Sequence, residues 1–154
     1  MVDFDTYQRR GLLKKCDSDF RQIARQISRA ARDMHTFALV VNDDPEWAAT
    51  IAYQSMLRAG RALLFSYGYL PADGQQHKTV VELTGIMLGS GYEVVIRQFD
   101  RFRKKRNVFF YESRDAGNAG EAAQAAETAR SLIEAVRNDI AAGHIQLELD
   151  VRNE

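Results

Sequence analysis

The stretch YEVVIRQFDRFRKKRNVFFYE, Tyr92 to Glu112, is the segment around which we interpret the rest of the chain. It predicts one long helix, because its apolar residues recur every three to four positions and so share one face. These apolar positions are Val95, Phe99, Phe102 and Phe109. Arg106 falls on the same stripe, four residues after Phe102 and three before Phe109, and Arg103 falls beside it.

A guanidinium on an apolar stripe is costly to bury unless a partner or a ligand satisfies its hydrogen-bond donors. An ordinary solvated basic run would turn its charges away from the phenylalanines, as we expect Arg101 and Lys104 to do. Arg106 is therefore the first functional candidate.

Four further helices are predicted around this segment, each from apolar residues at helical spacing. The first follows Asp17 or Ser18, its expected N-cap, and runs to about Val41. The others run from Pro45 to about Tyr67, from His77 to Leu88, and from about Gly120 to Ala142. Since the connections are short, the predicted fold class is all-α, an up-and-down helical bundle of about five main helices.

Three segments lie outside these helices. Tyr7 to Leu13 is a short amphipathic piece of undetermined structure, and Gly68 to Gly74 is expected to be a loop. The tail, His144 to Arg152, alternates apolar and polar residues, as a strand does. Two interpretations of this tail stay open: a short C-terminal strand that pairs with another chain, or a disordered end.

Length and composition indicate a single domain spanning residues 1–154. The 21 basic residues balance the 21 acidic ones, so any contact with nucleic acid must come from a local basic patch. Cys16 is the only cysteine, which excludes an internal disulfide and a cysteine-cluster metal site, and a lone thiol fits a cytoplasmic protein. Neither a signal peptide nor a membrane-spanning run is expected.

The remaining polar residues give weaker signals. The chain has three histidines, His35, His77 and His144, too far apart in sequence to suggest a metal site. No glycine-rich phosphate loop or nucleophile elbow occurs, and no cofactor is predicted. A row of arginines on the first long helix is expected to be a solvated face, with a phosphate-tracking surface as the alternative. It comprises Arg21, Arg25, Arg29 and Arg32.

One constellation could carry chemistry. Arg103, Asn107 and Tyr111 recur every four residues, with Arg106 beside them. Two guanidiniums, an amide and a phenol suit an anionic oxygen, such as that of a phosphodiester. The alternative is a structural helix in which Arg106 bonds to a carboxylate of a neighbouring helix, and spacing alone favours this alternative.

Two features of the chain carry a resemblance to a known family. Arg106-Asn107, three further residues and Tyr111 precede a loop and an alanine-rich last helix. Earlier, AYQSMLRAGRALLFSYGYLPADGQQHKTVVEL (Ala52 to Leu83) combines an alanine-rich helix, a leucine-containing turn, a loop and a helix that starts with a histidine. In both features the chain resembles the HEPN superfamily, over about Asp44 to Ile140.

The resemblance implies a helical bundle that dimerises and so brings two arginine motifs into one cleft. Active members are metal-independent ribonucleases, with a motif of Arg, a polar residue, a short spacer and His. Arg106 and Asn107 match its first two positions, but Tyr111 stands where the histidine is expected. A phenol with a pKa of ~10 is a poor general base at neutral pH, whereas a histidine at ~6.5 can shuttle a proton.

The resemblance therefore implies a HEPN-like homodimer that binds a nucleotide or RNA, as a toxin–antitoxin component or the partner of a small nucleotidyltransferase. The expected ligand-binding residues are Arg103, Arg106, Asn107, Tyr111 and His77, although a histidine at a helix start most often caps or packs. Two alternatives remain: an active metal-independent endoribonuclease, with Arg106, Asn107 and Tyr111 as its catalytic residues, and a non-catalytic protein-interaction bundle.

Overall fold

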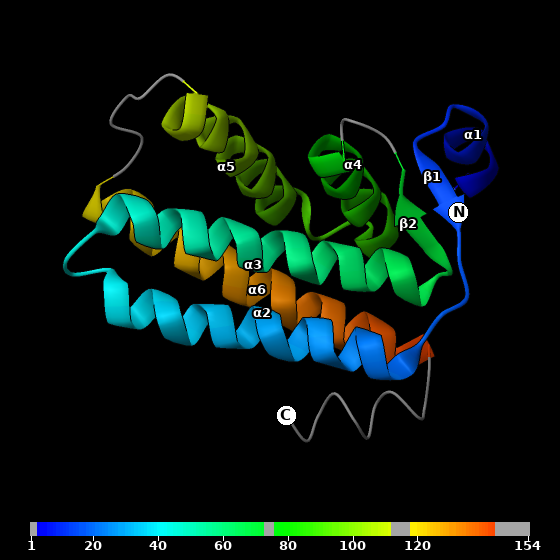
Figure 1. Cartoon of the computed structure of the whole chain (residues 1–154), viewed down its shortest axis with the longest axis horizontal. Helices are drawn as coiled ribbons and strands as arrows, with labels where there is room; N and C mark the ends of the chain where they lie inside the picture. The colour runs from blue at the N-terminus through cyan, green and yellow to red at the C-terminus, as the bar shows by residue number, and fades with distance from the viewer. Residues whose placement is uncertain (1–2, 73–75, 112–117, 144–154) are drawn as a thin grey trace.

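A computed structural model describes residues 3–72, 76–111 and 118–143, without the side chains of residues 107–111. Six helices and two short strands make up this part of the chain (Figure 1). In order they are α1 (Phe4–Arg9), β1 (Leu13–Lys15), α2 (Phe20–Val40), α3 (Pro45–Ser66), β2 (Tyr69–Pro71), α4 (Gln76–Leu88), α5 (Glu93–Tyr111) and α6 (Ala119–Gly143). The expected all-α helical bundle is confirmed.

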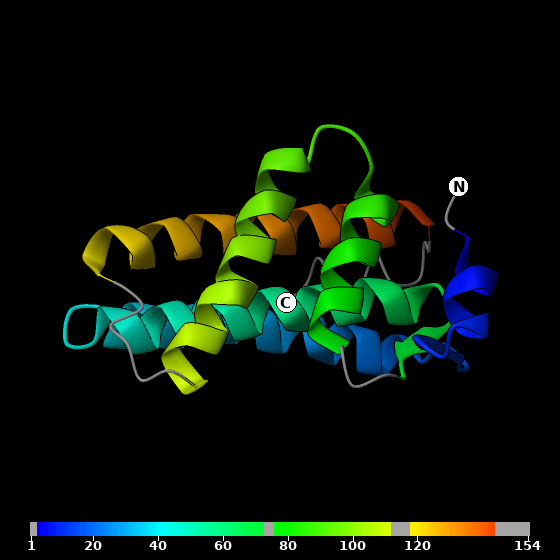
Figure 2. The ribbon, with the colours of Figure 1, turned by 90° about the horizontal axis from the view of Figure 1, so that it is seen from above.

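The three longest helices, α2, α3 and α6, lie side by side, and α2 runs opposite to α3 (Figure 1). The two shorter main helices, α4 and α5, lie next to each other on one side of this layer and cross α3 and α6 steeply (Figure 2). The helices α2, α3 and α6 thus form a platform, and the predicted arginine motif lies on α5, which crosses it.

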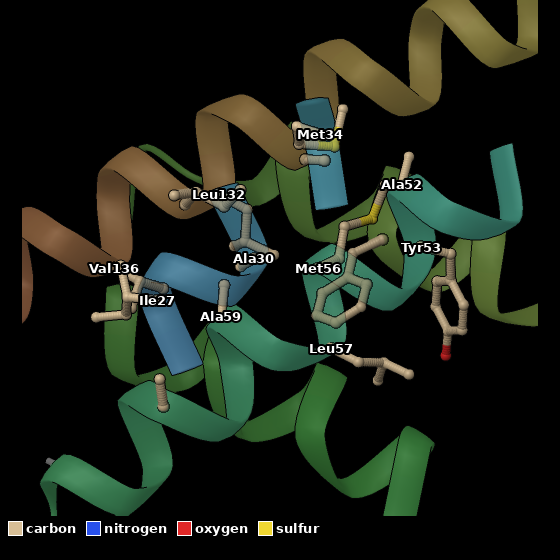
Figure 3. Close-up of a cluster of buried hydrophobic side chains, with 14 of the residues drawn as sticks. Ile27, Ala30, Met34, Ala52, Tyr53, Met56, Leu57, Ala59, Leu132 and Val136 are labelled. Atoms are coloured by element: carbon tan, nitrogen blue, oxygen red, sulfur yellow. The ribbon is translucent and has the colours of Figure 1, made fainter. Parts of the chain in front are cut away.

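Interlocking small and large side chains fill the centre of the bundle (Figure 3). Ile27, Ala30 and Met34 of α2 meet Met56 and Ala59 of α3, and Leu132 and Val136 of α6 close the same cluster. Every one of these residues is at most 6% exposed. The alanines let the helix axes approach closely, so the larger side chains can fill the space between them.

The start of α2 differs from the expected one. Asp19 is the N-cap, and its carboxylate accepts hydrogen bonds from the backbone amides of Arg21 and Gln22 at 3.0 and 3.3 Å. The prediction of Asp17 or Ser18 was therefore wrong by one or two residues. The Ser18 hydroxyl instead donates to the Phe65 carbonyl at 2.9 Å and holds the chain against the end of α3.

One strand of a two-stranded antiparallel sheet, β2, lies in the Gly68–Gly74 segment that was predicted to be a loop, and β1 begins at Leu13. Leu13 pairs with Pro71, and Lys15 pairs with Tyr69. Leu13 and Tyr69 are buried with Leu64 and Leu83, so the small sheet covers one end of α3 and α4. Each strand has only three residues, too few for an alternating pattern to stand out in the sequence.

The expected apolar stripe of α5 is present where side chains are described. Phe99 and Phe102 are 0% and 3% exposed, and Val95 packs partly buried against the same core. Lys104 turns to solvent as expected, but Arg101 does not. Its guanidinium lies 4.5 Å from the centre of the Phe102 ring, where a cation–π contact stabilises it, and bonds to Glu121 of α6 at 2.8 Å.

The remaining predictions concern the arginine row of α2, the C-terminal tail and membrane-spanning helices. The arginines of the α2 row, Arg21, Arg25, Arg29 and Arg32, are all exposed, as predicted for a solvated face. The tail, with its two open interpretations, and Glu112 lie outside the described residues. None of the helices that the structure describes is both long and apolar enough to cross a membrane.

Candidate anion-binding site

The side chains of the predicted site that the structure describes gather where α3, α4 and α5 meet. Arg103 and Arg106 come from α5, and His77 comes from the first turn of α4. The charges of both arginines act on His77, although they lie more than 25 residues away in sequence. The side chains of Asn107 and Tyr111 lie outside the described part, so the roles expected of them stay predictions.

Tyr53 of α3 forms the floor of this region. Its side chain is 1% exposed, and its hydroxyl lies 3.0 Å from Nδ1 of His77 in a hydrogen bond whose donor depends on the imidazole tautomer. Burial raises the pKa of Tyr53, and the charges of Arg106, Arg103 and Arg61 offset only part of that rise. The phenol therefore keeps its proton at neutral pH and holds His77 in a fixed orientation.

His77 is held in its neutral form. Burial, followed by the positive charges of Arg106, Arg61 and Arg103, lowers its pKa from 6.5 to about 4. An imidazole with that pKa is uncharged throughout the physiological range and can donate one hydrogen bond and accept another. The predicted His77 thus lies among the arginines of the motif.

Arg61 of α3 is a member of the site that the sequence analysis missed. Burial lowers the pKa of its guanidinium, and Arg58 lowers it further while Tyr53 opposes the change. Arg61 lies two helical turns after Tyr53, on a helix that is otherwise rich in small and apolar residues. The pair of guanidiniums that it forms with Arg58 in such a helix is the signal that could have identified it. We call Arg61, Arg103 and Arg106, together with Tyr53 and His77, the guanidinium cluster.

Arg103 is oriented from within its own helix. Its Nε donates to Asp100 at 2.8 Å, and Lys104 bonds to the other oxygen of the same carboxylate at 3.1 Å. Burial alone would raise the pKa of Asp100, but the bonds from Arg103 and Lys104 outweigh it and lower that pKa. Asp100 is therefore ionised and fixes Arg103, whose side chain is 19% exposed, at the edge of the cluster.

Arg106 lines a small cavity between α3 and α5. Glu46, Ala49, Thr50 and Tyr53 of α3 line it with Phe102, Lys105 and Arg106 of α5. Its volume of about 20 Å³ can hold about one water molecule. A phosphate group cannot enter such a space, so an anionic ligand has to bind where the cluster meets solvent.

Acidic residues also reach this region. Glu46 of α3 lines the same cavity as Arg106 of α5, so an acidic residue of a neighbouring helix lies in the region of the guanidinium. Glu121 of α6 bonds to Lys105 at 3.0 Å, and to Arg101. Burial would raise the pKa of Glu121, but the bonds from Arg101 and Lys105 lower it. These contacts attach the middle of α5 to α6.

The cluster brings three positive charges together, and the carboxylate of Asp100 offsets part of that charge at Arg103. Within it, Arg61, Arg103 and Arg106 surround two groups that are neutral at pH 7, and their charges repel one another. An anion at this place would relieve that repulsion and could accept hydrogen bonds from several guanidinium groups. The arrangement therefore suits a phosphate oxygen.

The other titratable side chains give no second site. His35 is exposed on α2, and burial raises the pKa of the half-buried Cys16 thiol, which lowers its reactivity. Within residues 3–72, 76–106 and 118–143, no three His, Cys, Asp or Glu side chains are grouped closely enough to hold a metal ion.

Comparison with models of protein families matches residues 20–139 to the HEPN domain. The match covers more than half of the chain and contains every member of the guanidinium cluster. HEPN domains are associated in general with nucleotide- and RNA-related functions. A search among curated proteins found no match to this chain.

Proposed function

We propose that this chain, which belongs to the HEPN domain family, binds RNA or a nucleotide through phosphate oxygens at the guanidinium cluster. Arg106 and Arg103 would donate to the phosphate, and the neutral His77 would add a further hydrogen bond. Asn107 and Tyr111 follow on the same helix and are proposed to contact the adjoining sugar or base.

One observation carries the proposal. Three guanidiniums from two helices act together on one neutral imidazole, although like charges in a partly buried place oppose one another. Arginines that served only to stabilise the fold would not have to lie near one another. The convergence of these three therefore favours an anionic ligand. The N–H groups of the guanidiniums and of the imidazole are the donors that phosphate recognition requires.

The proposal includes a homodimer in which two copies of the cluster face each other across a cleft. Such a protein would act as a toxin–antitoxin component or as the partner of a small nucleotidyltransferase. Sedimentation of the full chain tests the dimer. A variant without residues 144–152 tests the alternative. If this variant is a monomer but binds RNA as wild type does, a non-catalytic interaction bundle is the better account.

The binding experiment compares wild type with Arg106→Ala on a labelled single-stranded RNA. We expect about a tenfold to hundredfold loss of affinity, the range for losing hydrogen bonds between charged groups. Arg25→Ala is the matched control, because Arg25 is exposed on α2. Equal affinities of wild type and Arg106→Ala that do not respond to salt would remove the cluster from consideration.

A structural role for Arg106 predicts a different pattern. If the guanidinium serves only to satisfy Glu46 in their shared cavity, Arg106→Ala and Glu46→Gln should each lower the free energy of unfolding and leave RNA affinity unchanged. Measuring stability and affinity on both variants therefore separates a structural arginine from a ligand-binding one.

A second candidate function is metal-independent RNA cleavage, which the neutral His77 inside the cluster favours. His77 would take the proton of a ribose 2′-hydroxyl as that hydroxyl oxygen forms a bond to phosphorus. The bond between phosphorus and the 5′-oxygen would break, and the leaving 5′-oxygen would take up a proton from water. A pKa of about 4 makes His77 a weak base, so binding is the stronger candidate. Incubating the protein with labelled RNA in EDTA tests cleavage, and an active enzyme should lose it in His77→Ala.

A further inference from the structure

A shallow groove of about 760 Å³ runs between α4 and α5 and begins at the guanidinium cluster, because Arg103 belongs to both. We call it the α4–α5 groove. Its basic residues are Lys78, Arg97, Arg101, Arg103 and Lys104. In the part of the chain that the structure describes, two acidic residues, Glu82 and Asp100, line it with them. The groove is therefore strongly basic in a chain whose net charge is zero.

The charges of the groove are engaged to different degrees. Arg101 bonds to Glu121, while Arg103 and Lys104 share Asp100. Lys78 and Arg97 are exposed, and neither makes an ion pair with any residue that the structure describes. These two cations, one on each wall, are available to a ligand without first breaking an internal contact.

The spacing of the basic residues fits an extended chain of negative charges. Arg97, Arg101 and Lys104 follow one another at intervals of four and three residues, so they share a face of α5 and span about 10 Å along its axis. A nucleic-acid strand carries a charge about every 3.4 Å of duplex axis, so this span faces more than one phosphate.

The walls of the groove suit the backbone of a strand better than its bases. Its apolar lining consists of Val81 and Ile96, and among the side chains that the structure describes no aromatic ring lines it. Recognition of single strands by base stacking needs aromatic rings, whereas tracking of the backbone needs only positive charge. Binding along this groove is therefore expected to depend on salt and length and little on base sequence.

We propose that the α4–α5 groove extends the guanidinium cluster into a track for the backbone of single-stranded RNA, with Lys78 and Arg97 contacting phosphates beyond the one held at the cluster. This inference rests on the proposed function of the cluster and adds the substrate class: an oligonucleotide rather than a mononucleotide. Glu82, on the same wall as Lys78, opposes the strand and limits its affinity.

The test measures affinity for oligouridylates from two to about twelve nucleotides, at several salt concentrations. Lys78→Gln and Arg97→Gln should each weaken binding of the longest oligomer by about three- to tenfold and reduce the salt slope by about 0.7 to 1. Both should leave dinucleotide affinity within about twofold of wild type. Glu82→Gln should strengthen binding of the longest oligomer, and Arg25→Gln should change nothing.

The outcomes separate the groove from the cluster. If Arg106→Ala loses binding while Lys78→Gln and Arg97→Gln match wild type at every length, the track is overturned and the proposed function stands. If wild type binds no RNA of any length, both proposals fail. If an acidic peptide such as polyglutamate binds as tightly as RNA and loses affinity in the same variants, the groove receives an acidic protein segment instead.

Discussion

The pKa of His77 depends on the charges around its side chain. Its pKa is about 4 in the folded protein and ~6.5 in an unfolded chain. Above pH ~6.5 both states are neutral at this position, so the contribution of His77 to stability is fully present. As the pH falls from 6.5 towards 4, only the unfolded chain takes up the proton, and this contribution is lost.

We therefore predict that His77→Gln flattens the pH dependence of stability between about 6.5 and 4. Urea unfolding of wild type and variant across this range measures the effect, and the difference between the two curves isolates His77 from the carboxylates that titrate lower. His35→Gln is the control, because that side chain is exposed on α2. A wild-type curve with the same slope as His77→Gln would contradict the environment assigned to His77.

Asp33 supports a second prediction for a single residue. It is 7% exposed and joins α2 to α3, since its two oxygens accept from Arg29 at 3.1 Å and from Arg58 at 2.8 Å. Asp33→Ala should lower the free energy of unfolding by about 1–2 kcal/mol. This is less than the cost of breaking a fully buried ion pair, because both arginines reach solvent. Asp43→Ala, at an exposed position, should cost less than about 0.5 kcal/mol in the same denaturation experiment.

For single residues, the sequence predicted which side chains are buried better than it predicted which residues surround them. The helical period placed Phe99 and Phe102 in the core, and it marked Arg106 as a charge on an apolar stripe. The period of one helix says nothing about its neighbours in space. Arg61 and Tyr53 join the cluster only because α3 passes beneath α4 and α5, which is a property of the packing.

Among the elements, α3 and α4 approach each other at Gly60. A Cβ atom built there would lie 2.7 Å from both Val80 Cγ1 and Thr84 Oγ1, closer than real side chains allow. Gly60→Ala should therefore destabilise the protein by about 1–3 kcal/mol, although alanine is the better helix former. Val80→Ala removes one of the two clashes, so the double variant should lose less stability than the sum of the single ones.

Additive losses in Gly60→Ala and Val80→Ala would contradict this close approach. Gly143→Ala is the matched control, since a Cβ at the end of α6 meets no atom within 4 Å. Thermal unfolding of the four variants measures all of these effects. The helix that carries Tyr53 and Arg61 would be displaced by the same clash, so RNA affinity should fall along with stability.

The helices were predicted from the sequence, whereas the strands and the contacts between helices were not. The helices were predicted to within about two residues at most ends, because amphipathic spacing and proline or glycine stops are local signals. The strands β1 and β2 were missed, since three residues carry no period and Leu13 pairs with Pro71, far along the chain. Arg101 was misplaced because the contact that holds it, with Glu121, comes from another helix.

For the whole molecule, the bundle acts as a frame that holds charges from distant segments together. The helices α4 and α5 cross the layer of α2, α3 and α6 (Figure 2). Tyr53 and Arg61 come from α3 of that layer, and His77, Arg103 and Arg106 come from the crossing helices. The helical pattern was enough to predict an all-α bundle, and the resemblance to HEPN proteins was enough to predict the family. Neither could predict that His77 would lie against Tyr53.

The most direct test of a phosphate bound among these arginines is the pKa of His77 itself, followed by NMR while single-stranded RNA is added. An anion beside the imidazole offsets the charges of Arg106, Arg61 and Arg103, so the pKa should rise from about 4 by about one unit or more as RNA saturates the protein. A pKa that stays the same when RNA is bound would place the phosphate elsewhere and contradict the account.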